Sequence, residues 1–521
     1  MKFMTTCNLR KMMYYLKALC SVCFCLLFNS SRLDSQNWHQ KVDYQIDVRL
    51  DDQTNSIQAR EKVKYVNASP DTLKTIYFRL AWHGRASQVS SRFTVFSVQQ
   101  NGVAIDFEIL ESKPDPAVPP QSLSQNLLAV KLSRPLPPGD SDTYNIAWQA
   151  DVPVFSGGCG RNSPSGVDYT FTNWYPQACV YDRLGWHLGS PFSADYSSEF
   201  GSFKVDITMP PKYMVAATGI LTNADAIGYG FENQGVVLKP NYGLVTVWKF
   251  QAEKVRDFAW VADPELLHEK KQVRNGLTLH AFYFKNENRL TALESALNNL
   301  EKSALTYSFP QLSVVQMGEM RAEFPMLIFA AKEVPNLAPV ISWDFQTPVL
   351  KSTYLLKQFQ YAIGEVAFKN GLAEIAGRYR YGYPVSEESI HSFEKSSGLE
   401  LDWIWEQNAN TRAQVDYAIQ SVKTEVDNSM IVLERIKGAV LPVTIEVIYA
   451  DSTTQQLYIP VAYTQGVLPA GLAATPQPVW PAEDKKYTLK LNKPLESIKS
   501  LVIDPQELSG DVDPENNRKD F

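Results

Sequence analysis

The sequence predicts a multi-domain α+β protein, in which a large antiparallel β domain precedes a small mixed α/β domain and a second β domain. Three observations predict this order. The chain has 521 residues, which is too many for one hydrophobic core of ordinary size. Alternating apolar and polar residues dominate its first half and roughly its last hundred residues. Between these regions the apolar residues recur at helical spacing, so the class is mixed rather than all-β.

The amino-terminal segment, residues 1–33, has the features of a signal peptide. Lys2, Arg10 and Lys11 supply positive charge, and an apolar run over residues 18–28 follows them. This run is shorter than the about 20 apolar residues that a membrane-spanning helix needs. We therefore expect export to a periplasmic or extracellular location, with no stable membrane span after signal cleavage. A buried N-terminal helix is the alternative interpretation.

The first β domain is predicted over residues 36–262, and a proline-rich stretch at 113–120 should form an exposed loop within it. Period-two runs indicate strands at 44–50, 58–65, 126–132 and 203–208. Two cysteines, Cys159 and Cys179, lie outside the predicted signal peptide. In an oxidising compartment they would form a disulfide, and two free thiols are an equally weighted alternative.

The mixed α/β domain is predicted over residues 276–413. Its expected elements are a helix, two buried strands and two further helices, at 287–307, 312–316, 326–330, 351–366 and 387–397. The first helix has leucines at helical spacing with Glu and Lys on the opposite face. Ser386 is expected to cap the last helix.

The second β domain is predicted over residues 414–521. Its strands are indicated at 429–435, 443–449 and 456–461, a spacing typical of a β-sandwich. The net charge of the whole chain is −6, with acidic and basic residues mixed along it. This distribution lacks the clustered basic face of nucleic-acid-binding proteins, so we expect no nucleic-acid partner.

Several phrases, in their order along the chain, are similar to those of one peptidase family. They are FTNWYP at 171–176, VAATGI at 215–220, VRDFAWVAD at 255–263, EFP at 323–325, the helix at 361–368 and the stretch 393–405. The sequence thereby resembles the membrane alanyl aminopeptidase family of gluzincin zinc peptidases. The resemblance implies that residues 36–262 form a β saddle domain and that residues 276–413 correspond to a truncated thermolysin-like catalytic domain.

The zinc chemistry of that family needs two histidines four residues apart on a helix, a glutamate between them and a distant glutamate ligand. This chain has six histidines, at positions 39, 83, 187, 268, 280 and 391, and no two of them are four apart. His268-Glu269 begins like the zinc motif, but Gln272 stands where the second ligand is required. We interpret His268 as part of a charged turn together with Lys270 and Lys271.

The resemblance implies that a deletion removed the missing ligands. In the family, a zinc helix and a second ligand-bearing helix follow the phrase that matches Glu323-Phe-Pro325. Here the chain reaches residues 347–351 after about twenty residues, and this phrase resembles the family's Pro-Tyr-x-Lys stretch. Val349 stands at the position of the tyrosine that stabilises the oxyanion, a contribution of about 3 kcal/mol in comparable sites. We therefore expect no catalytic residue, no metal ligand, no bound zinc or other cofactor, and no hydrolysis by the family mechanism.

Glu323 is the one candidate site residue. It matches the family glutamate that pairs with the free amino terminus of a substrate. Arg321 lies two residues before it, so a structural ion pair is the alternative. Expected partners are peptides or an envelope protein. Two further hypotheses are an active zinc aminopeptidase with an unconventional ligand set, for instance carboxylates with His391, and a decayed remnant without function.

Overall fold

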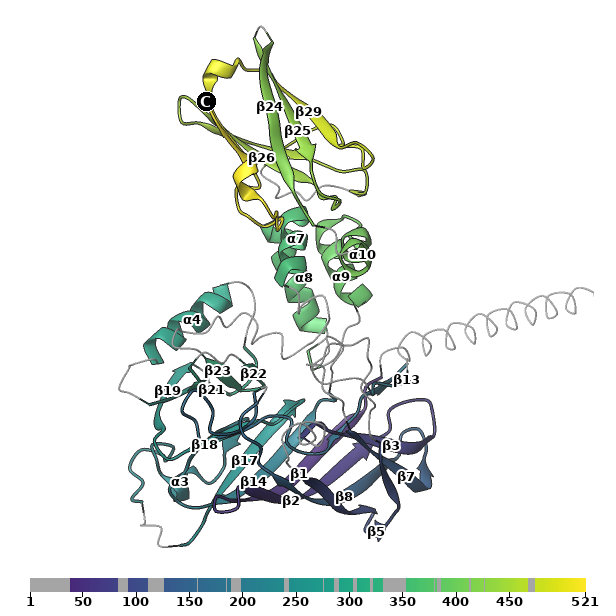
Figure 1. The fold of residues 1–521 in the computed structure, drawn as a ribbon, viewed down its shortest axis with the longest axis vertical. Helices are drawn as coiled ribbons and strands as arrows, with labels where there is room; N and C mark the ends of the chain where they lie inside the picture. The colour runs from purple at the N-terminus through teal and green to yellow at the C-terminus, as the bar shows by residue number, and fades with distance from the viewer. Residues whose placement is uncertain are drawn as a thin grey trace, which may run out of the picture.

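The computed structural model describes residues 38–82, 92–110, 126–156, 158–183, 185–188, 198–238, 243–274, 276–284, 290–302, 307–318, 322–330, 353–378, 380–381, 386–411, 414–425, 427–466 and 474–521. The predicted signal peptide, the proline-rich loop and the stretch that contains Val349 lie outside these ranges. Figure 1 shows the large β domain at the bottom, the small mixed sheet beside it, four helices in the middle and the second β domain at the top.

An eight-stranded sheet forms the base of the first β domain. Its strands, in spatial order, are β16 (Ile220–Leu221), β17 (Thr246–Val255), β14 (Gly201–Met209), β1 (Lys41–Asp51), β2 (Ser56–Val66), β8 (Ser141–Asp151), β4 (Phe93–Gln100) and β5 (Val103–Ala104). β1 and β14 are parallel, and the other neighbours are antiparallel. Every second side chain of β1 and β2 is buried, as the period-two runs predict. One face of the sheet therefore packs on the core and the other faces water.

Two four-stranded sheets complete this domain. One contains β15 (Met214–Ala217), β18 (Trp260–Asp263), β10 (Tyr169–Phe171) and β9 (Gly160–Arg161), and the other β11 (Gln177–Ala178), β3 (Leu73–Leu80), β7 (Asn126–Leu136) and β6 (Phe107–Leu110). A hairpin of β12 (Tyr181–Asp182) and β13 (Gly185–Trp186) and the short helix α3 (Ala224–Ile227) are added to them. Aromatic rings join the layers: Trp148 of β8 lies 6.0 Å from Trp174, and Tyr144 of β8 lies 6.1 Å from Phe78 of β3.

The mixed domain contains a five-stranded sheet and helix α4 (Leu290–Lys302). The strand order is β19 (Leu267–Arg274), β20 (Leu277–Tyr283), β21 (Gln311–Gln316), β23 (Leu327–Ala330) and β22 (Ala322–Phe324). β21 and β23 confirm the two predicted buried strands, and α4 lies within the predicted amphipathic helix. The inner pairs β20–β21 and β21–β23 are parallel, whereas both edge strands pair antiparallel.

Four helices follow, α7 (Thr353–Ile363), α8 (Glu365–Arg378), α9 (Ser386–Ser397) and α10 (Asp402–Thr411). The helix predicted over 351–366 is wrong at its end, because Gly364 adopts a φ of 79° and separates α7 from α8. Helix α8 was predicted only at its start, where it overlaps the helix at 361–368. α9 confirms the helix at 387–397, although Ser386 is its first residue rather than a residue outside it.

The second β domain has two sheets, as the strand spacing predicts. The strands are β24 (Tyr417–Glu425), β25 (Asn428–Arg435) and β29 (Lys486–Leu491) in one sheet, and β28 (Thr475–Pro476), β27 (Thr454–Ile459), β26 (Val443–Tyr449), β30 (Ile498–Ile503) and β31 (Arg518–Asp520) in the other. Two 3₁₀ turns, η1 (Leu495–Ser497) and η2 (Pro514–Asn517), accompany them. The backbone N–H of Thr444 donates to Tyr361 Oη of α7 at 2.9 Å, which fixes this domain to the helices.

Cys159 and Cys179 are buried and are not joined by a disulfide, so the disulfide alternative is wrong. Burial raises the pKa of the Cys179 thiol, which keeps it protonated and unreactive at neutral pH. Across the described ranges, no helix combines the length and the apolar character that crossing a membrane requires.

Candidate functional site

Glu323 lies at the centre of β22, the edge strand of the five-stranded sheet. Its backbone is paired with Ile328 of β23, and Ala322 and Phe324 on either side of it face Phe329 and Leu327. No other strand in the described part of the chain pairs with β22. An edge strand presents unpaired backbone N–H and C=O groups, to which an extended peptide can add.

A tight turn joins β22 to β23 and sets the position of Glu323. Phe324 and Leu327 are paired, so Pro325 and Met326 are the two central residues of the hairpin. Met326 has a φ of 61°, which is the left-handed conformation required at the third position of a type II turn. Proline favours the second position of that turn because its ring fixes φ. The buried Met326 side chain, 2% exposed, offsets the conformational cost by packing on the core.

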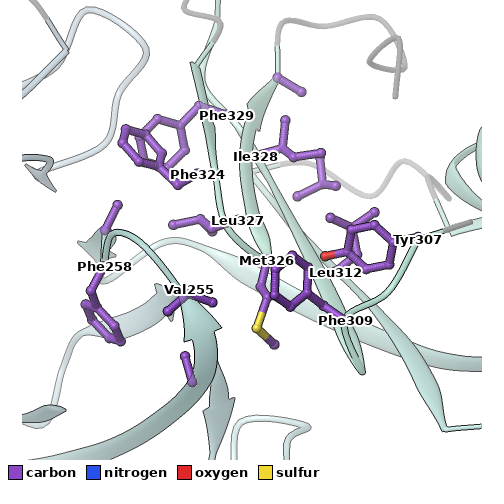
Figure 2. Packing of buried hydrophobic residues seen from close by; sticks show 14 of the residues in the cluster. Val255, Phe258, Tyr307, Phe309, Leu312, Phe324, Met326, Leu327, Ile328 and Phe329 are labelled. Atoms are coloured by element: carbon purple, nitrogen blue, oxygen red, sulfur yellow. The ribbon is translucent and has the colours of Figure 1, made fainter. Parts of the chain in front are cut away.

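The β22–β23 hairpin packs on buried apolar side chains. Figure 2 shows Met326 next to Phe309, while Val255 and Phe258 of the first β domain approach from the other side. Leu327 and Phe329 of β23 are 0% and 1% exposed. The five-stranded sheet thus packs against the first β domain through buried apolar side chains, and this packing holds the edge strand β22 in place.

Polar contacts across the same boundary fix the sheet further. Gln311 Nε2, at the start of β21, donates a buried hydrogen bond of 3.0 Å to the carbonyl of Gly219. Ser165 Oγ lies 3.8 Å from Met317 Sδ. These contacts tie the central strand of the small sheet to two separate loops of the first β domain, so the two parts present β22 as one unit.

Comparison with known proteins identifies the architecture. No family model matches the sequence, and no curated protein matches it. Among solved structures, aminopeptidase A from Legionella pneumophila, in complex with aspartic acid, is similar over 90% of this chain, with a TM-score of 0.55 and 12% sequence identity. This chain spans 58% of the length of that enzyme. The fold is M1 aminopeptidase-like. A mutant M1 zinc metallopeptidase from Deinococcus radiodurans, bound to a Tyr-Ser-Ala substrate, is similar over 71% of this chain and 94% of its own, at 12% identity and a TM-score of 0.48.

The M1-like fold confirms the predicted class: β domain, mixed α/β domain and β domain, in that order. The fold of the Legionella pneumophila aminopeptidase A agrees with the resemblance of the sequence phrases at the level of fold. Identities of 12% establish the fold alone. The similarity therefore assigns no role to any single residue of this chain, and the predicted roles are assessed from the contacts of each residue.

The side-chain partner of Glu323 stays a prediction. Arg321 lies outside the described ranges, and Glu323 is placed by its backbone pairing. Val349 and the place of the predicted deletion, between β23 and α7, also lie outside them. The choice between an amine-binding carboxylate and a structural ion pair is therefore open.

No metal centre is assembled by the described residues, among which no three His, Cys, Asp or Glu side chains group as ligands. His391, named in the alternative ligand set, lies on α9 with its side chain 72% exposed. Its Nδ1 is 3.3 Å from Glu394 Oε2, one helical turn further on. This contact is an ordinary surface pair, and the absence of zinc from the protein remains a prediction.

Two histidines of this M1-like fold do meet, which the sequence spacing did not reveal. His268 lies on the edge strand β19 and not in a charged turn, so that prediction is wrong. Lys270 and Lys271 are exposed, and both form hydrogen bonds. His268 Nε2 is 2.8 Å from His280 Nδ1 of β20. The His268 ring stacks on Phe231 at 3.9 Å and on Phe282 at 4.8 Å. The register of the β19–β20 hairpin explains the contact. Lys270 is paired with His280, so His268, two residues before Lys270, lies diagonally across from His280.

The histidine pair is a hydrogen-bonded clasp rather than a metal site. His268 Nδ1 donates to the carbonyl of Tyr229 at 3.0 Å, because a carbonyl oxygen can only accept. In the neutral pair, His268 Nε2 then accepts from His280 Nδ1–H. Two ring nitrogens bound to one tetrahedral zinc stand roughly 3.3 Å apart, so both cannot be ligands at the observed 2.8 Å. The pair also lies on β19 and β20, at the end of the sheet opposite to β22.

We expect the clasp to be acid-labile. Burial lowers the pKa of His268 to about 4, and burial together with the neighbouring His268 lowers the pKa of His280 to about 3. Both lie below the roughly 6.5 of an unfolded histidine, so stability is lost as the pH falls from about 6.5 toward 4. When the pH is lowered from about 7 to 5, the melting temperature of the double variant His268→Phe/His280→Leu should fall less than that of the wild type.

Thermal unfolding followed by circular dichroism measures this difference. His391→Gln is the matched control, because its exposed ring should leave the pH dependence unchanged. An equal loss of melting temperature in the double variant and the wild type would show that the clasp is not the acid-sensitive element.

Proposed function

We propose that this chain is an exported, aminopeptidase-like protein that binds the amino-terminal end of a peptide or protein along β22 and does not hydrolyse it with zinc. The observation that carries the proposal is the rigidly supported edge strand β22 with Glu323 at its centre, in a chain without two histidines four residues apart. The aminopeptidase-like fold supports a peptide as ligand. The sequence features of residues 1–33 support export.

The binding mode follows from the geometry of an edge strand. A peptide added beside β22 would gain backbone hydrogen bonds over the three residues of this strand. So short a strand gives modest affinity and little selectivity. The Glu323 carboxylate would add a charge-assisted bond to the ammonium group at the end of the peptide. Binding should therefore weaken above about pH 8, where α-amino groups lose their proton.

The first test is hydrolysis and metal content. The purified full chain should hold substoichiometric zinc by plasma mass spectrometry after incubation with the metal, and it should not cleave aminoacyl-coumarin substrates. Without a metal-activated water and an oxyanion donor, the family mechanism has no nucleophile and no stabilised intermediate. Stoichiometric zinc, together with turnover that a chelator abolishes, would instead establish the alternative function of an active zinc aminopeptidase with an unconventional ligand set.

The second test is binding of short fluorescent peptides with free or acetylated amino ends. Peptides with free amino ends should bind more tightly than acetylated ones. Glu323→Gln should weaken binding of the free-ended peptides about tenfold, because a charge-assisted bond contributes roughly 1.5 kcal/mol. Glu483→Gln, at an exposed position of the second β domain, is the matched control. Equal affinity for free and acetylated peptides would contradict the role of Glu323. No binding of either peptide, in a protein with cooperative unfolding, would contradict the binding function itself.

A further inference from the structure

The water-facing side of the eight-stranded sheet carries an unusual row of side chains. Cross-strand pairing places six residues side by side on six consecutive strands from β4 to β17: Gln99, Asn145, Lys62, Gln45, Lys204 and Gln251. All six are exposed or half-exposed, and each belongs to the outward-facing set of its strand. Four are amides, two are lysines, and none is acidic.

The neighbouring rows differ from this amide–lysine row. One step along the strands, Arg60, Asp47, Asp206 and Lys249 lie side by side, and Lys249 Nζ is 3.0 Å from Asp206 Oδ2. One step in the other direction, Lys64 faces Asp43. Positive and negative charges are thus balanced in both of these rows.

In the amide–lysine row the two ammonium groups have no such balance. In the described structure neither Lys62 nor Lys204 lies within ion-pair distance of a carboxylate, and Gln45 stands between them. Glu253, two residues after Gln251 on β17, accepts a hydrogen bond of 2.9 Å from Gln251 Nε2. Among the described residues, neither ammonium group therefore has an ion-pair partner, although Asp43 and Asp47 lie two residues to either side of Gln45 on β1.

The chemistry of the row narrows the class of ligand. A side-chain amide offers a donor and an acceptor together, which matches a sugar hydroxyl, and each ammonium group matches one acidic group. The two lysines are two strands apart, about 10 Å, which suits single charges separated along a chain. Protein interfaces centre on buried apolar or aromatic side chains, and single-stranded nucleic acids stack on aromatic rings. The row contains neither.

We propose that the amide–lysine row binds an acidic polysaccharide, with the amides on its hydroxyls and with Lys62 and Lys204 on carboxylates of its uronic acid units. The row runs across the strands, so the sugar chain lies perpendicular to them. This site is separate from β22 and does not depend on the function proposed for Glu323.

The test compares binding of an oligogalacturonate and of a neutral malto-oligosaccharide of the same length to the full chain, by isothermal titration calorimetry. The oligogalacturonate should bind more tightly than the neutral sugar, and added salt should weaken its binding. The double variant Lys62→Gln/Lys204→Gln should weaken oligogalacturonate binding by about tenfold or more, since each lysine faces a separate acidic group. Lys486→Gln/Lys490→Gln, two exposed lysines on β29, changes the net charge equally and should leave the affinity unchanged.

A third variant separates recognition of hydroxyls from simple charge attraction. Gln45→Val keeps the strand and the lysines but removes the central amide, and it should weaken oligogalacturonate binding without changing its salt dependence. Equal binding by the wild type and the Lys62→Gln/Lys204→Gln variant would overturn the proposal. So would equal affinity for the neutral sugar, or tighter binding of a DNA oligonucleotide or of an acidic peptide of similar charge.

Discussion

Replacing Glu61 by leucine should raise the free energy of unfolding by about 2–4 kcal/mol at pH 8. Glu61 lies in the middle of β2, between Ile46 of β1 and Ile146 of β8, and is 2% exposed. It shares the buried face with its strand neighbours Ala59 and Val63. Neither carboxyl oxygen has a hydrogen-bond partner among the described residues. A leucine has nearly the same size and removes the polar group from this apolar site.

The expected pH dependence identifies the cause. Burial raises the pKa of Glu61 well above its ordinary value, so the folded protein holds a proton that the unfolded chain releases. Stability contributed in this way is present below about pH 4.5 and is lost as the pH rises toward the folded pKa, at about 1.4 kcal/mol per pH unit. Glu61→Leu should therefore flatten the fall in stability that begins above about pH 4.5 and ends at the raised folded pKa.

Urea titrations at several pH values measure this effect. Glu61→Gln removes the charge but keeps a buried polar group, so it should flatten the pH dependence with a smaller gain in stability. Glu108→Leu, on the exposed side of β6, is the matched control and should change neither. A loss of stability in Glu61→Leu at pH 8 would mean that the carboxylate is paired in solution.

Removing the Trp260 side chain should have the opposite effect, a loss of about 3–5 kcal/mol. Trp260 of β18 is fully buried, and its ring stacks on Phe171 with centroids 3.7 Å apart and planes at 7°. Trp174 meets the same ring edge-on at 6.0 Å. Trp260→Ala would remove the middle of this aromatic cluster and leave a cavity between the sheets of the first β domain.

The urea midpoint of Trp260→Ala should fall, with the slope of the transition unchanged if the domain still unfolds in one step. Phe96→Ala serves as control, because Phe96 is 59% exposed on β4 and contributes little buried area. A loss below about 1 kcal/mol for Trp260→Ala would show that the surrounding rings close over the vacated space.

The alternation of apolar residues was enough to predict the long strands of both β domains, because burial on one face imposes a period of two. Most of helix α8 was missed for a local reason. It contains Gly371, which interrupts a helical pattern on propensity grounds. In the structure a Cβ at Gly371 would lie 2.5 Å from Phe393 Cδ1, so the glycine permits close packing of α8 on α9. That packing cannot be inferred from the helix alone.

The candidate site was predicted in part. The buried strand predicted at 326–330 is confirmed by β23, whereas β22, the strand that contains Glu323, was not predicted. The contact between His268 and His280 was missed because it depends on the register of the β19–β20 hairpin, which their separation along the chain does not disclose. The face that carries Lys62 and Lys204 was hidden for the same reason, since neighbouring strands of a sheet come from distant parts of the sequence.

The parallel pairing of β1 with β14 has a consequence for how the protein is made. Ser202, at the start of β14, donates its backbone N–H to Asp43 of β1, a residue 159 positions earlier. As the polypeptide emerges amino end first, β2 can join one side of β1 at once, whereas the other side waits until β14 has been synthesised. Closing so long a loop is entropically slow, and a half-built sheet with a bare central strand invites association with other chains. This topology therefore leaves one edge of β1 open to pairing with other chains until residues 201–209 have been synthesised.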